Sequence, residues 1–155
     1  MSAAAVAAAE AAALEGTALD DPHARAALHA RVAEVVGGSW WTACGPPVTL
    51  VTPRRTARSS TARARDGVAA VEIRLTDEQL TVATVAHELA HALAGVGEGH
   101  GSRFRTAYVD VVALLAGAAA ADRLRDAFTT FGVPAGQRAW PAPWRAEGST
   151  FRVVP

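Results

Sequence analysis

Two histidines and a glutamate lie close together in the segment His87-Glu88-Leu89-Ala90-His91, which has the form H-E-x-x-H. Residues four positions apart lie on one face of an α-helix, so the imidazoles of His87 and His91 could reach the same metal ion. Glu88 follows the first histidine and could act on a water bound to that metal. The motif therefore predicts a zinc hydrolase centre with two ligands, a general base and an open coordination position.

A catalytic zinc ion normally has three protein ligands, so one more ligand is expected from outside the motif. His100 is the preferred candidate because it follows a glycine-rich break in the helix and directly precedes Gly101. Glycines let the chain turn back tightly and return an imidazole to the metal. Two carboxylates, Glu98 and Asp110, stay open as alternative ligands because an oxygen atom would also serve.

The chemistry predicted for this centre is hydrolysis of an amide bond, most plausibly in a peptide. Zinc lowers the pKa of a bound water to about 7, and Glu88 would take the proton while the water oxygen attacks the carbonyl. The zinc ion and one further donor would stabilise the oxyanion. Tyr108, the only tyrosine, could be that donor. The alternative, which we favour, is that Tyr108 packs in the core with Phe104.

The motif needs a helix to hold it, and the sequence predicts one from Leu80 to about Leu93. Apolar residues lie on nearly all sides of this segment, which is typical of a helix inside a domain. Thr76 and Gln79 match a capping box in front of it. Buried histidines and a buried glutamate would be costly without partners, and a metal ion would supply one.

Strands are expected before this helix, at residues 48–51 and 68–75, and Asp66-Gly67 is typical of a hairpin turn. In the second strand Val71, Ile73 and Leu75 alternate with charged residues, so one face should be buried. With further helices on both sides of the motif, we expect an α+β fold.

The motif, followed by His100-Gly101-Ser102-Arg103-Phe104, resembles the zincin-type metallopeptidases. More narrowly, it is similar to the SprT-like and WLM-like group, in which H-E-x-x-H is followed by H-G-x-x-F. The strand at 71–75 lies where that group has the strand before its active helix. The resemblance covers about residues 60–115. It implies a minimal zincin-like fold, in which a small sheet of about three strands packs on the buried motif helix. It also implies one catalytic zinc ion, and a peptide or protein substrate laid along an edge strand.

Three parts of the chain are expected on this basis. An alanine-rich N-terminal extension at 1–19, helical or frayed, precedes a zincin-like metallopeptidase domain at 20–131. A tail at 132–155, containing prolines and tryptophans, would pack on the domain. The extension lacks a basic segment and is interrupted by Glu10, so it does not resemble a signal peptide.

Composition limits the partners that the chain is expected to have. Its net charge is zero, and no apolar run reaches the roughly 18 residues of a membrane span. Cys44 is the only cysteine, which excludes an intrachain disulfide framework and favours a cytoplasmic location. All fifteen basic residues of the chain are arginine. The arginines between Arg54 and Arg65 are interpreted as a solvated hairpin face, because no aromatic residues lie among them.

Two other functions stay open at this point. The chain could be a SprT-like protease that acts on nucleic-acid-bound proteins and is recruited by the arginines at 54–65. SprT-like proteins of that kind often carry a cysteine zinc ribbon, however, and this chain has only Cys44. The chain could also be a non-catalytic, metal-stabilised binding module. Glu88 argues against that function because a structural site does not need a base.

Overall fold

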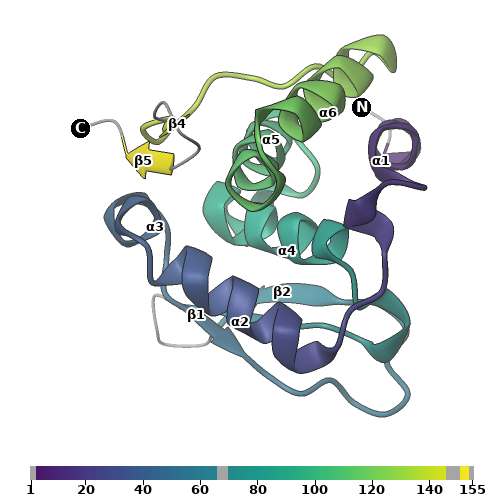
Figure 1. Ribbon diagram of the computed structural model, residues 1–155, viewed down its shortest axis with the longest axis vertical. Helices are drawn as coiled ribbons and strands as arrows, with labels where there is room; N and C mark the ends of the chain where they lie inside the picture. Colours follow the sequence, from purple (N-terminus) through teal and green to yellow (C-terminus); the bar gives the residue numbers. More distant parts are fainter. Residues whose placement is uncertain (1–2, 66–69, 146–150, 154–155) are drawn as a thin grey trace.

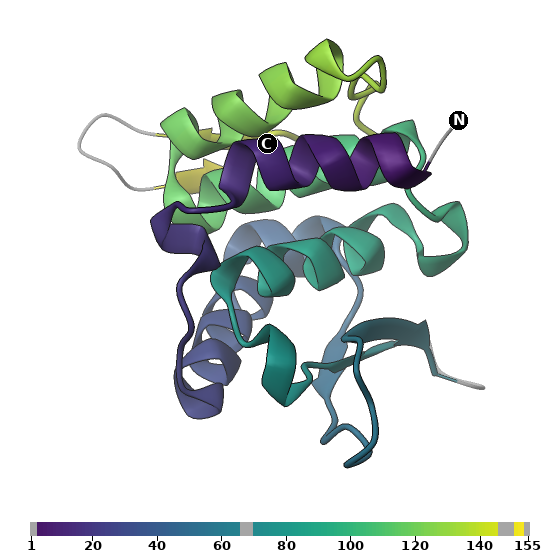
Figure 2. The same cartoon turned by 90° about the vertical axis from the view of Figure 1, so that its right-hand side faces the viewer.

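The computed structural model describes residues 3–65, 70–145 and 151–153. Its central element is helix α4 (Val82–Ala94), which carries the H-E-x-x-H motif (Figure 1). On one side lie α1 (Ala3–Leu14), α5 (Ser102–Ala116) and α6 (Ala118–Thr130). On the other lie α2 (Arg25–Val36) and a small sheet (Figure 2), and α3 (Ser39–Cys44) follows α2. The predicted α+β class, with a sheet packed on the motif helix, is confirmed.

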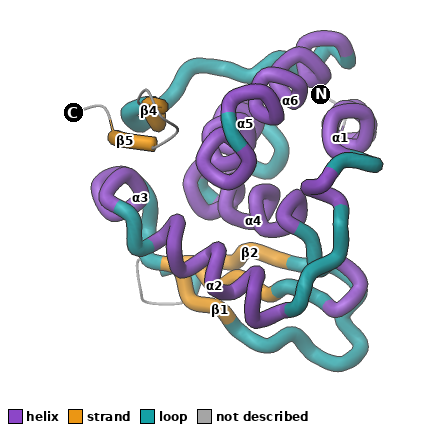
Figure 3. The backbone as a smooth tube through the Cα atoms, in the orientation of Figure 1, coloured by secondary structure: helices purple, strands orange, loops and turns teal. Residues whose placement is uncertain are grey.

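The sheet has three strands in the order β1-β3-β2, and they are β1 (Val48–Leu50), β2 (Thr61–Ala64) and β3 (Val71–Arg74). Figure 3 shows strands in orange. β3 pairs with β1 in parallel and with β2 antiparallel. Val71 and Ile73 are buried while Glu72 and Arg74 are half-buried, which is the predicted alternation. The predicted turn at Asp66-Gly67 lies outside the described residues. Within the described part of the chain, one edge of β2 is free.

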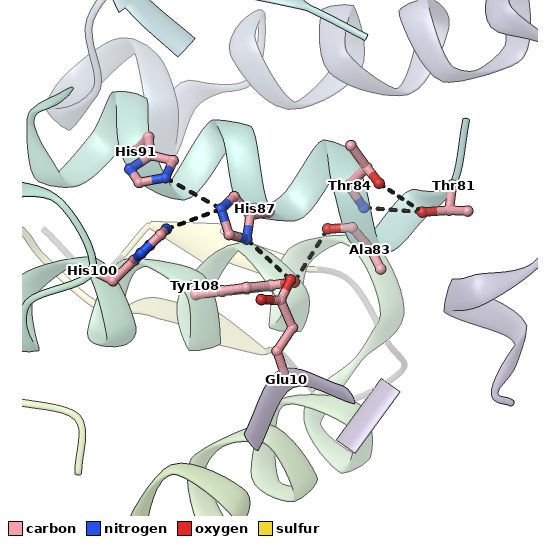
Figure 4. A network of polar contacts seen from close by, with 8 residues as sticks. All are labelled: Glu10, Thr81, Ala83, Thr84, His87, His91, His100 and Tyr108. Carbon is pink, nitrogen blue, oxygen red and sulfur yellow. Dashed lines mark hydrogen bonds and ion pairs between the residues drawn. The ribbon is translucent and has the colours of Figure 1, made fainter. Parts of the chain in front are cut away.

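Helix α1 packs on α6 through small apolar side chains. Val6, Ala9 and Ala13 are buried and belong to the same core as the residues of α4 and α5. Alanine allows the helices to approach closely, because it has no side chain beyond Cβ. Glu10 lies among these alanines and points toward α4 and α5 (Figure 4). No helix in the described ranges is long and apolar enough to cross a membrane.

The chain after α6 is held against the body of the protein by polar contacts. Asp110 on α5 is 2% exposed, and its carboxylate accepts two hydrogen bonds from Arg138, each 2.8 Å long. The same carboxylate accepts a third from Nε1 of Trp140 at 2.8 Å. Trp40 donates to the carbonyl of Pro141 at 2.7 Å. Beyond these contacts, β4 (Pro143–Arg145) pairs with β5 (Phe151–Val153).

The motif helix begins two residues later than predicted, at Val82, and the predicted capping box is wrong. Thr81 caps the helix, and its Oγ1 accepts a hydrogen bond from the backbone N–H of Thr84 at 3.1 Å. Residues 77–79 form a separate 3₁₀ turn. There Oε1 of Gln79 accepts from the backbone N–H of Ser60 at 2.6 Å, so it links this turn to the residue before β2 instead of capping the motif helix.

Candidate metal centre

Helix α4 places His87 and His91 one turn apart on the side that faces α5. The helix ends at Gly95, whose φ of 101° is a backbone conformation that favours glycine. A 3₁₀ turn at Val96–Glu98 and Gly99, with a φ of 63°, then reverse the chain. His100 comes back beside the two histidines of α4 (Figure 4). The glycine-rich break therefore has the role that the sequence predicted for it.

The backbone at His100 is held by a buried arginine that the sequence analysis did not single out. Arg105 is 1% exposed, and its Nη1 donates to the carbonyl of His100 at 2.6 Å. Its Nε donates to the carbonyl of Pro134 at 3.0 Å. The guanidinium thus joins the loop that carries His100 to the segment that follows α6. Nothing in the local sequence distinguishes Arg105 from the other fourteen arginines.

The Nε2 atoms of the three histidines converge. Nε2 of His87 lies 3.2 Å from Nε2 of His91 and 3.3 Å from Nε2 of His100. In a tetrahedral site with Zn–N bonds of about 2.0–2.1 Å, neighbouring ligand nitrogens are about 3.3 Å apart. The cluster His87, His91 and His100 could therefore hold a metal ion.

Glu10 determines which nitrogen of His87 is free to bind a metal. Its Oε1 lies 3.0 Å from Nδ1 of His87 and accepts a hydrogen bond from the Tyr108 hydroxyl at 2.6 Å. A carboxylate can only accept, so Nδ1 of His87 carries a proton and Nε2 is the nitrogen left to bind a metal. One ring nitrogen cannot form good hydrogen bonds with two others at once, whereas a cation between three imidazoles would use a lone pair from each. The donor set therefore fits a metal ion.

The pKa shifts leave two of the three imidazoles of the cluster neutral. Burial, together with the charge of His87, lowers the pKa of His91 to about 4, and the same causes lower the pKa of His100. Burial also acts to lower the pKa of His87, but the hydrogen bond and charge of Glu10 raise it on balance. His91 and His100 are thus neutral at pH 7, which is the form that binds a metal.

Glu88 lies next to His87 on the same helix and is 5% exposed. Burial raises its pKa to about 7; the charge of His87 acts in the opposite direction, and the charge of Glu10 adds to the increase. No residue in the described ranges forms a hydrogen bond with its carboxylate. Glu88 is thus a buried carboxyl group that can hold or release a proton near neutral pH.

Three other candidates from the sequence do not lie in the cluster. Asp110 is bound to Arg138 and Trp140, as described above, and Glu98 lies folded over Gly101 at the surface. The hydroxyl of Tyr108 contacts Glu10 and the carbonyl of Ala83, on the Nδ1 side of His87 and away from the converging Nε2 atoms. The ring of Tyr108 is fully buried and packs 5.6 Å from that of Phe104.

Sequence reasoning missed Glu10 and the contact of Phe104 with the three histidines. The ring centroid of Phe104 lies 4.4 Å from that of His91, 4.8 Å from that of His100 and 5.1 Å from that of His87, so one ring supports all three imidazoles. Glu10 did leave a signal, because it is the only charged residue in α1. A lone glutamate on an otherwise apolar helix needs a buried partner or a water-facing position.

Comparison of the chain with models of known protein families, with curated proteins and with solved structures finds no match. The geometry and chemistry of the three histidines therefore stand without support from a known relative.

Proposed function

We propose that this chain is a zinc-dependent metallopeptidase in which His87, His91 and His100 hold one zinc ion and Glu88 is the general base. One observation carries the proposal: three Nε2 atoms converge, and the residue that follows the first of these histidines on the same helix is a buried glutamate. The resemblance of residues 60–115 to the zincin-type metallopeptidases supports it.

The ligand set suits a catalytic zinc ion. Three imidazoles are a ligand set of catalytic zinc sites and leave the fourth coordination position to water or substrate. A zinc ion held there would lower the pKa of a bound water and polarise the carbonyl of a substrate. Glu10, through Nδ1 of His87, would keep the ring oriented and its Nε2 basic.

Glu88 is suited to move a proton during hydrolysis. In this scheme its carboxylate accepts a proton from the attacking water while the water oxygen forms a bond to the peptide carbonyl carbon. As the C–N bond breaks, Glu88 returns that proton to the leaving nitrogen, so its protonation state is restored. Burial keeps the pKa of the carboxyl group at about 7 in the metal-free protein, where both protonation states are accessible.

The proposed substrate is a peptide bound in an extended conformation. The free edge of β2 offers unpaired backbone groups to such a segment. β2 also contacts both α4 and the 3₁₀ turn that leads to His100. A peptide paired with β2 would therefore run beside the elements that carry the metal ligands.

The test combines metal analysis with cleavage of a peptide library by the wild type and the Glu88→Gln variant. Glu78→Gln is a matched control, since Glu78 is an exposed glutamate in the turn before α4. We expect one zinc ion per chain in all three proteins. Cleavage should fall about 10²–10⁴-fold in Glu88→Gln alone, as for loss of a general base.

The two ways in which the proposal could fail are distinguishable. Stoichiometric zinc without Glu88-dependent cleavage would indicate a metal-stabilised module that is not an enzyme. Absence of zinc after purification and dialysis against zinc would show that the histidine cluster is not a metal site.

A further inference from the structure

A second polar site lies on the small sheet, apart from the histidine cluster. It is a cavity of about 210 Å³ that contains the side chains of three arginines and no acidic residue. Its lining residues, here called the arginine pocket, are Pro53, Arg54, Ala57, Ser59, Thr61, Arg63 and Arg74. Two of these arginines belong to the basic run that the sequence suggested was only a solvated face, and Arg74 joins them from β3.

The strand register places this pocket on the sheet face opposite α4. Thr61 pairs with Arg74, and Arg63 pairs with Glu72. Side chains alternate between the two faces of a strand, and Val71 and Ile73 occupy the buried face of β3. Paired residues project to the same face of a sheet. The side chains of both pairs therefore lie on the face opposite Val71 and Ile73.

The guanidinium groups of the pocket have few partners. Arg74 contacts Glu72 at 3.4 Å through Nη2, and its Nε is buried without a hydrogen-bond partner. That nitrogen is the only buried side-chain N or O atom in the described ranges with this property. Arg54 and Arg63 form no ion pair with any described residue. A guanidinium has five N–H donors, so the pocket holds a large surplus of donors and positive charge.

We propose that the arginine pocket binds the carboxylate of an acidic side chain in a peptide paired along the free edge of β2. Every second side chain of such a peptide would project to the sheet face of Arg63 and Arg74. Arginine is well matched to a carboxylate, because its planar fork can donate two parallel hydrogen bonds. Binding of an acidic peptide to this pocket does not depend on the proposed function. That the bound peptide is a substrate does rest on the proposed function, and in that case acidic segments are the preferred substrates.

The test measures binding of two fluorescein-labelled peptides, (Thr-Glu)₃ and (Thr-Gln)₃, by fluorescence anisotropy. The full chain carrying Glu88→Gln is used so that no peptide is cleaved, with and without EDTA. We expect the Glu peptide to bind about tenfold more tightly than the Gln peptide, as for a charge-assisted hydrogen bond. The added double change Arg54→Gln and Arg63→Gln should remove that preference, because it takes two of the three guanidinium groups out of the pocket. Both side chains are exposed, so they can be replaced without disturbing the core.

Arg58→Gln is the matched control, since Arg58 belongs to the same basic run but does not line the pocket. Equal binding of the two peptides, or an equal loss of binding in Arg58→Gln, would overturn the proposal. A third arm titrates inorganic phosphate by calorimetry. Arginine-dependent binding of phosphate without binding of the Glu peptide would replace the peptide assignment by a small-anion site. Because binding is measured in EDTA, its failure is separable from failure of the zinc site.

Discussion

Glu10 and His87 are 77 residues apart in the sequence, yet Oε1 of Glu10 accepts a hydrogen bond from Nδ1 of His87 at 3.0 Å. The carboxylate is itself oriented by the hydroxyl of Tyr108. Burial acts to raise the pKa of Glu10, but the hydrogen bond and charge of His87 lower it on balance, so the carboxylate stays ionised. The N-terminal helix therefore fixes the orientation and tautomer of the first histidine of the cluster.

Replacing Glu10 should weaken metal binding. In Glu10→Ala, Nδ1 of His87 loses its acceptor, and we expect zinc affinity to fall about 10–100-fold. Affinity can be measured by competition with a chromogenic chelator. Glu15→Gln, a change at an exposed glutamate just after α1, is the control and should bind zinc as the wild type does. Equal affinities in Glu10→Ala and the control would show that Glu10 does not support the ligand.

Tyr108→Phe separates a packing role from an oxyanion role. The variant keeps the buried ring and loses the hydroxyl, with its contacts to Glu10 and to the carbonyl of Ala83. The free energy of unfolding should therefore fall by about 1–2 kcal/mol. Peptide cleavage should fall less than about tenfold, whereas loss of an oxyanion donor costs about 10²–10³-fold. Urea unfolding and cleavage rates measure the two effects. A large loss of cleavage with unchanged stability would support the oxyanion role.

Asp110 should stabilise the fold without binding the metal. Asp110→Ala removes three hydrogen bonds to a buried carboxylate, two of them from Arg138, and should lower the free energy of unfolding by about 2–4 kcal/mol. Asp122→Ala removes an exposed pair with Arg125 and should cost less than about 1 kcal/mol. Metal analysis should give equal zinc in both variants. Loss of zinc from a folded Asp110→Ala protein would identify Asp110 as a ligand.

Glu88 should make the metal-free protein less stable as pH rises. Its folded pKa is about 7 and its ordinary value is 4.5, so between these values the folded state holds a proton that the unfolded state has released. The contribution of Glu88 to the free energy of unfolding of the wild type is therefore lost as pH rises from 4.5 to 7. Above pH 7 that contribution stays constant. In Glu88→Gln this residue does not titrate, so the variant keeps its free energy of unfolding over this pH range. Relative to the wild type, its free energy of unfolding should rise by on the order of 3 kcal/mol across that range.

Urea unfolding in EDTA at several pH values between 4.5 and 8 measures this difference. Glu78→Gln again serves as the control, and its stability should follow that of the wild type at every pH. Parallel stability curves for Glu88→Gln and the wild type would mean that Glu88 titrates normally in the folded protein.

Much of the fold and of the ligand set could be predicted from local patterns. The alternation of Val71 and Ile73 with charged residues predicted β3, and the glycines after α4 predicted the chain reversal that brings back His100. The beginning of α4 was less predictable, because Thr76 and Thr81 both offer capping side chains. In the fold Thr81 caps the helix, while Gln79 accepts a hydrogen bond from Ser60, a residue of another segment.

The sequence by itself determined that His87, His91 and Glu88 lie together, because helical geometry fixes residues that are one to four positions apart. Only the tertiary structure decided that Glu10 lies behind His87, that Asp110 holds the C-terminal segment instead of a metal, and that Arg74 joins Arg54 and Arg63. The physical reason is that these contacts depend on how α1, α5 and the strands pack. That packing is a sum of many weak interactions over the whole core, so no residue spacing in the sequence predicts it.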